Sequence, residues 1–245
     1  MPTITETVRE IALSQPSSIR VFERFGIDYC CGGRKPLAVA CNEQAVEIDT
    51  VLAALAEAAA EIELEQTDWS KSSLEALVAH INSQHHEYLK TELPRLTALA
   101  KKVTAAHGVN HPELAELEAT VQALSDELTQ HLAKEELVLF PYVTGLERAL
   151  AGKGMTPRAC FGTIASPIAV MSQEHDDAGE ALAQIRQLTS EYTVPQDACP
   201  TYHAYMGGLK ALEQDLHQHI HLENNILFPR AIAMEASAMQ TAISH

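Results

Sequence analysis

The sequence predicts an all-α protein in which a small N-terminal helical domain is followed by a four-helix bundle. Aromatic residues make up only 5% of the 245 residues, whereas Ala, Leu, Glu and Gln, which favour helices, recur throughout. Long stretches contain neither glycine nor proline. A chain of this length is large enough for a substantial bundle together with a small extra domain.

Residues 1–66 form the predicted small helical domain. Its short helical patterns are interrupted by one glycine and two prolines (Pro16, Gly26 and Pro36). It also contains a turn with two adjacent cysteines and two adjacent glycines, Cys30-Cys31-Gly32-Gly33. The polar stretch 67–73 then offers an N-cap to a long periodic helix that begins at Leu74. We therefore place the domain boundary before residue 67.

The second domain, residues 67–245, contains four predicted long helices. They span about residues 73–106, 112–150, 166–192 and 200–235. Pro112 and Pro167 lie near helix starts, where a missing N–H costs no hydrogen bond. Long helices joined by short links predict an antiparallel bundle. The exception is the connection 151–163, which contains three glycines and one proline and is predicted to be a surface loop.

Charge and composition exclude several classes of function. The formal net charge of −16 and the lack of a dense Lys/Arg cluster argue against a nucleic-acid partner. The N-terminus is polar and no apolar run approaches the roughly 18 residues of a membrane span, so we expect a protein that is neither membrane-bound nor exported. Five cysteines, two of them adjacent, are then best interpreted as reduced thiols. We expect a cytoplasmic protein.

The bundle region contains an internal repeat. HLAKEELVLFP, which starts at His131, and HIHLENNILFP, which starts at His219, share the pattern H-x3-E-x3-L-F-P. Upstream, SQHHE at residues 83–87 resembles SQEHD at residues 172–176, and this alignment pairs His86 with His175. Each half is therefore predicted to be one helical hairpin, with a histidine on its first helix and His-x3-Glu on its second.

The repeated polar residues lie on apolar helix faces. His131 with Glu135, and His219 with Glu223, are four residues apart and share one face of a helix. The first pair interrupts an apolar stripe that consists of Leu117, Val121, Leu124, Leu128, Val138 and Tyr142. The second pair interrupts a stripe of Leu209, Leu212, Leu216 and Ile226, and leaves His217 and His221 on a more polar side that we expect to face solvent.

For His175 and His86, the sequence indicates the helix face of the first more clearly than that of the second. His175 lies on a stripe with Ile168, Met171, Ala178, Leu182 and Ile185. His86 is less clear, because His85 continues the stripe from upstream whereas His86 continues the one that runs to Leu89 and beyond. The repeat alignment favours His86.

These six residues predict a metal site with two ions. Two carboxylates in an apolar interior cost several kcal/mol each unless their charge is balanced, and no Lys or Arg recurs on these stripes. A single buried histidine is more often a hydrogen-bonded core residue than a ligand, but packing does not explain the joint pattern. Six ligands are too many for one tetrahedral zinc and suit two ions bridged by both glutamates. Nitrogen and oxygen donors without thiolate favour iron, with manganese or zinc as alternatives, and leave coordination positions open.

The adjacent cysteines Cys30 and Cys31 allow several interpretations. They can form a strained disulfide, bind a metal transiently or carry a persulfide, or they can be small, reduced and partly buried residues. We favour a function, because Gly32 and Gly33 would let a ligand or partner approach the backbone. The other three cysteines, at positions 41, 160 and 199, are isolated and are interpreted as ordinary residues.

At this point the motifs resemble a known family, the repair-of-iron-centres di-iron proteins. The resemblance rests on DYCCGG at residues 28–33, KEE at 134–136, EHD at 174–176 and HLENNILFPRA at 221–231, and it covers nearly the whole chain. These proteins join an N-terminal cysteine domain to a hemerythrin-like bundle. The resemblance implies iron ligands at His86, His131, His175 and His219 with bridging carboxylates at Glu135 and Glu223. The sequence departs from the family pattern in the long connection 151–163 and in His221.

The resemblance also implies a function. It suggests a cytoplasmic homodimer that restores iron–sulfur clusters damaged by nitric oxide or oxidants in client proteins, by supplying iron from two non-haem ions that are oxo- or hydroxo-bridged. Cys30 and Cys31 would then be iron-transfer or redox thiols. Two alternatives remain: a hemerythrin-like module that binds O2 or NO, and a di-iron enzyme that reduces nitric oxide. A carrier has no need of a domain with two adjacent cysteines, so we favour the repair function.

Overall fold

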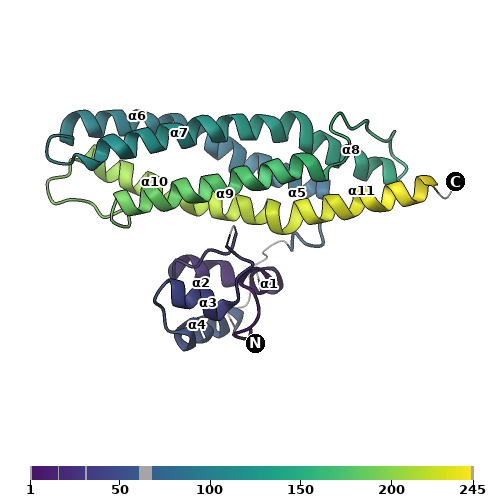
Figure 1. The fold of residues 1–245 in the computed structure, drawn as a ribbon, viewed down its shortest axis with the longest axis horizontal. Helices are drawn as coiled ribbons and strands as arrows, with labels where there is room; N and C mark the ends of the chain where they lie inside the picture. The colour runs from purple at the N-terminus through teal and green to yellow at the C-terminus, as the bar shows by residue number, and fades with distance from the viewer. Residues whose placement is uncertain (1, 16, 31, 61–67, 244–245) are drawn as a thin grey trace. The chain divides into compact units, whose positions relative to one another are not determined.

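The computed structural model describes residues 2–15, 17–30, 32–60 and 68–243 (Figure 1). Over these residues the regular structure is helical, and the strand-like pairing consists of one isolated antiparallel bridge between Thr7 and Pro36. The prediction of an all-α fold is therefore confirmed. The chain divides into two compact units, of which the first comprises residues 1–73 with His217–Arg230 and the second comprises Leu74–Leu216 with the residues from Ala231 onward.

In the described N-terminal part of the first unit, residues 2–15, 17–30 and 32–60, the structure has four helices. They are α1 (Val8–Ser14), α2 (Ser18–Arg24), α3 (Leu37–Glu43) and α4 (Ile48–Ala60). α1 begins with a capping box, since the Thr7 hydroxyl accepts the Glu10 N–H and the Glu10 carboxylate accepts the Thr7 N–H. The helices bury a common apolar core that includes Ile11, Phe22, Leu37 and Leu55.

The loop with the adjacent cysteines is organised by Asp28. Its carboxylate accepts the backbone N–H groups of Cys30 at 2.9 Å and Gly32 at 2.8 Å. A Cβ on Gly33 would lie 2.5 Å from the carbonyl oxygen of Tyr29, so only glycine fits there. A Cβ on Gly32 would lie 2.9 Å from the Asp28 carboxylate. The two glycines thus have an internal steric role, whereas the sequence had suggested space for a ligand or partner.

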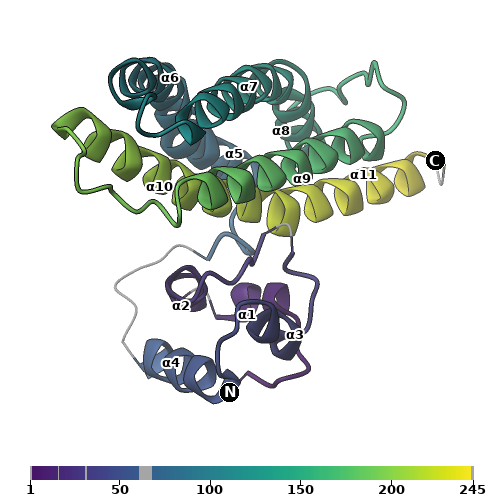
Figure 2. The ribbon, with the colours of Figure 1, turned by 60° about the vertical axis from the view of Figure 1, so that its left-hand side comes forward.

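Over the described residues, four helical segments form the bundle, and three of them are built from three consecutive helices. They are α5 (Leu74–Ile81), η1 (Asn82–His86) and α6 (Glu87–His107); α7 (Glu113–Lys134), η2 (Glu135–Leu139) and α8 (Phe140–Leu150); α9 (Ala165–Leu188); and α10 (Pro200–His221), η3 (Leu222–Leu227) and α11 (Phe228–Ile243). Figures 1 and 2 show α6, α7, α9 and α10 side by side. The four predicted helices are thus present, although the fourth extends beyond residue 235.

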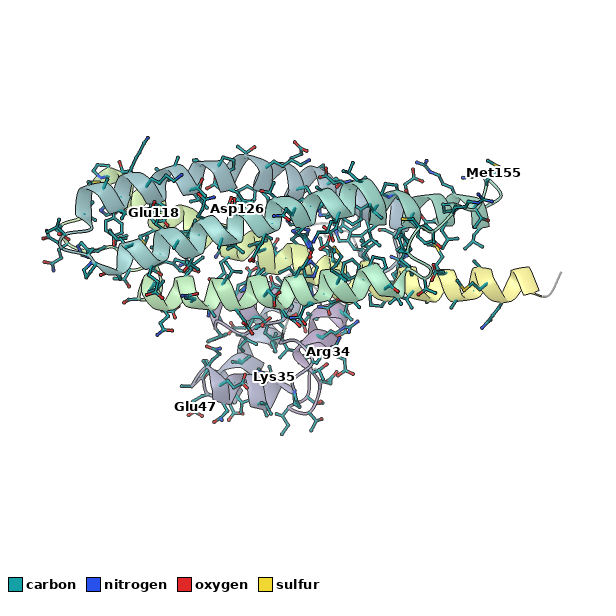
Figure 3. The ribbon with its side chains drawn as sticks, turned by 45° about the horizontal axis from the view of Figure 1, so that its top comes forward. Arg34, Lys35, Glu47, Glu118, Asp126 and Met155 are labelled. Carbon is teal, nitrogen blue, oxygen red and sulfur yellow. The ribbon has the colours of Figure 1, made fainter. Side chains whose placement is uncertain are left out.

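The core of the bundle consists mainly of leucines from all four segments. Fully buried examples are Leu89, Leu96, Leu117, Leu124, Leu182 and Leu209. Gly208 lets α10 approach α6, because a Cβ there would lie 2.7 Å from the Leu96 side chain. Polar residues cover the outside, such as Asp126 on α7 in Figure 3. No helix among the described residues combines the length and apolar character required to cross a membrane.

In the part of the chain that the structure describes, the segments η1, η2 and η3 are π-helical, and each coincides with a repeated polar motif. η1 ends at His86, η2 begins at Glu135 and η3 contains Glu223. A π turn contains one extra residue, so it shifts the face that the following residues present, and such turns occur often at functional sites. The shift corrects one prediction: Val138 is 40% exposed, and Leu139 takes the buried position instead.

Of the two long connections, the one at 151–163 agrees with the prediction, whereas the one after α9 begins earlier than predicted. The connection 151–163 is an exposed loop as expected, and Met155 projects from it in Figure 3. The third helix ends earlier than predicted, at Leu188, because Ser190, Glu191 and Tyr192 have positive φ angles of 46°, 59° and 59°. Helical periodicity continues through these residues in the sequence, but the backbone turns.

Candidate metal centre

His131 and Glu135 face the bundle interior at the junction of α7 and η2. Nε2 of His131 lies 3.3 Å from Oε2 of Glu135, and Nε2 of His86, from η1, lies 3.4 Å from the same oxygen. Nε2 of His175, from α9, lies 3.1 Å from Nε2 of His131. His86 and His131 therefore direct the same ring nitrogen toward one oxygen of a carboxylate that is completely buried, and the His175 ring lies beside that of His131.

The last helix supplies the second His–Glu pair. Nε2 of His219, on α10, lies 3.2 Å from Oε1 of Glu223, on η3. His219 is 1% exposed and Glu223 is fully buried. The geometry repeats that of His131 and Glu135, as the internal repeat predicts.

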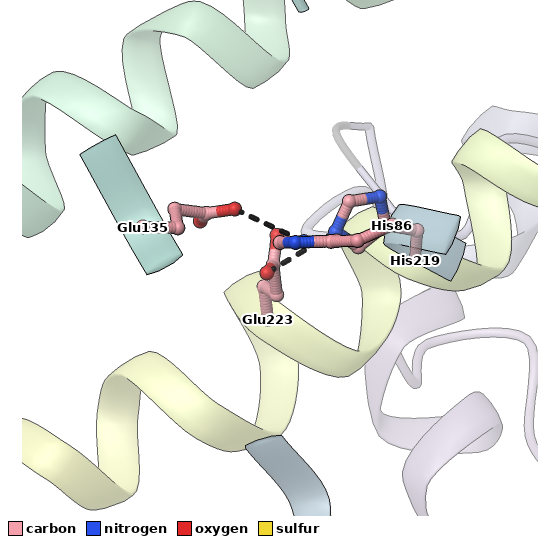
Figure 4. A group of neighbouring side chains, drawn as sticks. All are labelled: His86, Glu135, His219 and Glu223. Atoms are coloured by element: carbon pink, nitrogen blue, oxygen red, sulfur yellow. Dashed lines mark ion pairs between the residues drawn. The ribbon is translucent and has the colours of Figure 1, made fainter. Parts of the chain in front are cut away.

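These side chains form two groups with the geometry of a cation site. The first group is His86, Glu135, His219 and Glu223, and the second is His131, Glu135, His175 and Glu223. Within each group the candidate ligand atoms all lie within 4.8 Å of one another. Figure 4 shows the first group, with its two His–Glu ion pairs dashed. Both glutamates belong to both groups, and two buried carboxylates surrounded by imidazoles suit cations with nitrogen and oxygen ligands.

Two further glutamates hold the outer nitrogens of two of these histidines. Glu136 lies 2.9 Å from Nδ1 of His86, and Glu174 lies 2.8 Å from Nδ1 of His131. An Nδ1–H that donates to a carboxylate leaves Nε2 as the nitrogen with the free lone pair, which is the atom that faces the centre. These contacts favour the tautomer that a metal ligand requires.

Each of these two outer glutamates also forms an ion pair with a lysine at the surface. Lys90 lies 2.8 Å from Glu136, and Lys134 pairs with Glu174. Partial burial raises the pKa of both carboxyl groups, but hydrogen bonds from the lysine and the histidine outweigh it and leave each pKa below its ordinary value. Both carboxylates are therefore ionised at neutral pH. Sequence reasoning did not single out either glutamate, although each stands next to a repeated residue in KEE or EHD.

The neighbouring histidines are placed differently from one another. His85 is also buried, but it contacts Asp215 at 2.9 Å and belongs to neither group of four. The expectation that His221 faces solvent is wrong: it is 3% exposed, its ring packs on Tyr29, and the Asn225 amide donates to its Nδ1 at 2.8 Å. Burial is the main reason that the pKa of His221 falls to about 4. His217 is partly exposed.

Of the two adjacent cysteines, Cys30 lies within the described residues. Cys30 is 6% exposed, and its thiol donates to the Asp28 carboxylate at 3.2 Å. Cys31 lies outside the described residues. Among the described residues, Cys41, Cys160 and Cys199 have free thiols.

The fold and the buried His/Glu groups define a helical protein with a cation-binding centre. Residues 77–231 match the hemerythrin HHE cation binding domain family, and residues 4–59 match a domain of unknown function, DUF542 (ScdA_N). A hemerythrin-type domain fits iron as the bound metal, in agreement with the nitrogen and oxygen donors described above.

Several relatives are similar to this chain over nearly their whole length. The iron-sulfur cluster repair protein YtfE of Dickeya chrysanthemi is 36% identical over 94% of this chain and 98% of its own. Proteins of the same name from Cronobacter sakazakii and Escherichia coli O81 are each 38% identical over 92% of this chain and 96% of their own. The chain belongs to this family of iron-sulfur cluster repair proteins with a hemerythrin HHE domain. The resemblance seen in the sequence is confirmed.

Proposed function

We propose that this chain is a di-iron protein that repairs damaged iron–sulfur clusters and supplies iron for that repair. The observation that carries the proposal is the pair of four-residue groups that share both buried glutamates. The names of the relatives supply the cluster-repair context. The clients would be proteins whose iron–sulfur clusters have lost iron.

In this proposal one ion is held by His86 and His219 and the other by His131 and His175. Glu135 and Glu223 would bridge the two ions, since each belongs to both groups. Bound iron would supply the metal that a damaged cluster requires, with coordination positions open to water, an oxo group or a small molecule. The two carboxylates balance part of the charge of the ions, and the lack of thiolate among the six donors favours exchange over permanent retention.

The metal assignment is tested by counting ions in purified protein and in variants. Wild-type protein should carry close to two irons per chain with an oxo-bridge absorption band. Glu135→Ala and Glu223→Ala should lower the iron content, whereas His203→Ala, which changes an exposed histidine on α10, should leave it unchanged. One tightly held zinc per chain, or equal loss in all three variants, would contradict the assignment. Circular dichroism of each variant checks that the bundle has folded.

The repair function is tested by transfer to a client. Iron-loaded protein is mixed with a purified protein whose cluster has been removed or nitrosylated, and both cluster recovery and iron loss from the donor are followed. Recovery with matching iron loss supports iron donation. Nitric oxide consumption without iron loss would instead support the alternative of a nitric oxide reducing or O2/NO-binding di-iron protein.

A further inference from the structure

The loop that carries Cys30 is held against the segment of α10 and η3 that carries His219 and Glu223. Both the loop and this segment belong to the first of the two compact units. The loop residue that makes the contacts is Tyr29, which is fully buried and directly precedes Cys30. None of the contacts described below involves a proposed metal ligand, yet they lie next to two such ligands in the chain.

Asn225 ties the loop to η3 with the two N–H donors of its side-chain amide. Its Nδ2 lies 3.3 Å from the carbonyl oxygen of Tyr29 and 2.8 Å from Nδ1 of His221. Asn225 is only 7% exposed, so both hydrogen bonds are shielded from water. Its backbone carbonyl also accepts the Arg9 guanidinium at 3.4 Å. We call Asn225, His221 and Tyr29 the latch.

Ring contacts and a carboxylate support the latch. The Tyr29 ring meets the His221 ring edge-on, with centroids 5.5 Å apart, and its centroid lies 6.0 Å from that of the His217 ring. The Tyr29 hydroxyl donates to Oε1 of Glu23 at 3.0 Å, and the Gln218 amide donates to the same oxygen at 3.1 Å. The ring of Tyr29 is therefore fixed to α10, while its backbone carbonyl is fixed to η3.

The thiol next to the latch is closed in. Cys30 is 6% exposed, and both its sulfur and its backbone N–H donate to the Asp28 carboxylate, at 3.2 Å and 2.9 Å. Because the sulfur is buried, a reagent reaches it only after the loop opens locally. Tyr29 and Cys30 are neighbours in the chain, so such an opening competes with the hydrogen bond from Asn225 to the Tyr29 carbonyl.

The turn that carries Asn225 also carries a proposed metal ligand. Glu223 and Asn225 both lie in η3, two residues apart, so they point to different sides of it. Glu223 joins the buried His/Glu groups, whereas Asn225 contacts Tyr29. Without a cation, Glu135 and Glu223 are two buried carboxylates whose charge is not balanced, which destabilises η3. A bound dication removes this cost and holds η3 in place.

We propose that the latch couples the Cys30 thiol to the metal centre: it keeps the thiol inaccessible while a dication holds η3 in place, and it releases the thiol when the dication leaves. This inference rests on the proposed metal centre, since the dication acts through Glu223. The coupling is reciprocal, so opening of the loop weakens cation binding by the same factor. Cys30 thus becomes reactive at the stage at which the centre has given up its ions.

The first test compares alkylation of Cys30 by iodoacetamide in full-length protein loaded with iron(II) and in protein stripped by a chelator. A Cys31→Ser background makes Cys30 the one cysteine of the tryptic peptide 25–34, so mass spectrometry follows it alone. Removal of iron should speed alkylation of Cys30 about fivefold or more, the factor that corresponds to the loss of one hydrogen bond. The exposed Cys160 should react equally fast in both samples.

A variant of the latch and a matched control are tested in the same background. Asn225→Leu keeps a side chain of similar size but donates no hydrogen bond, so Cys30 should react about fivefold or more faster in the iron-loaded variant, and removal of iron should add little. Asn224→Leu, which changes a partly exposed amide in the same turn, should keep both the slow rate and its dependence on iron. Slow alkylation of Cys30 in folded Asn225→Leu would overturn the proposal.

Failure of the latch and failure of the metal centre give different results, because the iron content of each sample is counted alongside the rates. Iron uptake that leaves the Cys30 rate unchanged overturns the coupling alone. Protein that takes up no iron contradicts the proposed function and the coupling with it. If circular dichroism shows that Asn225→Leu has not folded, the comparison of iron-loaded with stripped protein decides: a faster Cys30 without iron supports the coupling, and equal rates overturn it.

Discussion

Oε1 of Glu136 lies 2.9 Å from Nδ1 of His86, and the same carboxylate holds the surface ammonium of Lys90. Glu174 has the same relationship to His131 and Lys134. Each four-residue group thus contains one histidine whose outer nitrogen is held by an ionised carboxylate. Such contacts orient the ring and make Nε2 a stronger donor to a metal.

Replacing either outer glutamate should weaken metal binding without removing a ligand. Glu136→Gln and Glu174→Gln should each lower iron affinity about 10- to 100-fold, because a neutral amide supports the donating Nδ1–H less well. Competition with a chelator measures the change. Glu87→Gln is the matched control, since Glu87 also contacts Lys90, at 2.9 Å, but is exposed. Equal effects of Glu87→Gln and Glu136→Gln would assign the change to the lysine contact.

The sequence repeat explains why the six inner residues were predictable and the outer glutamates were not. His86, His131, Glu135, His175, His219 and Glu223 recur in both hairpins, so each supports the other. The outer positions do not recur: in the alignment, Asn224 stands opposite Glu136, and His85 stands opposite Glu174. The internal repeat therefore does not indicate Glu136 or Glu174, and only the fold brings Glu174 to His131.

Burial was harder to predict where the backbone or a distant segment decides it. An ideal helix places Val138 on the buried stripe, but the π turn at Glu135–Leu139 moves Leu139 there. His221 lies on a polar face of its own helix, and its burial comes from Tyr29, almost 200 residues earlier and in the same compact unit. The periodicity of a sequence describes one ideal helix at a time, so it predicts neither the shift that a π turn causes nor burial by a segment distant in sequence.

Glu235 should be important for stability although it is remote from the metal centre. This buried carboxylate on α11 accepts the Ile164 N–H at 3.0 Å, at the start of α9, and the Tyr142 hydroxyl at 2.7 Å. Glu235→Ala leaves two buried donors without their acceptor and should destabilise the protein by about 2–4 kcal/mol. Tyr142→Phe removes only one of these bonds and should cost about 1 kcal/mol. Urea unfolding of both variants checks the order, and a smaller effect of Glu235→Ala would contradict it.

His111 should contribute more to stability at low pH than at high pH. Hydrogen bonds with Asp197 first, and then with Glu113, raise the pKa of His111 above its ordinary value. A raised pKa in the folded state means that the stabilisation is complete below the unfolded value of about 6.5 and is lost as pH rises through the folded value. His111→Ala should therefore lower the urea midpoint more at pH 5.5 than at pH 8. Asp197→Asn should reduce this pH dependence, and a pH-independent effect of His111→Ala would contradict the prediction.

The adjacent cysteines provide the test of iron transfer, because all six proposed ligands lie outside their loop. Removing thiols that do not contact a metal leaves its coordination intact, so the double variant Cys30→Ser/Cys31→Ser should keep the wild-type iron content and absorption band. If the thiols pass iron to a client, this variant should restore clusters more slowly than wild type, because the transfer step loses its soft ligands while the store stays full. Cys160→Ser, which removes an exposed thiol, is the control and should repair at the wild-type rate. Unchanged repair by the double variant would leave the pair with a structural or docking role, whereas loss of iron would mean that these thiols take part in metal binding.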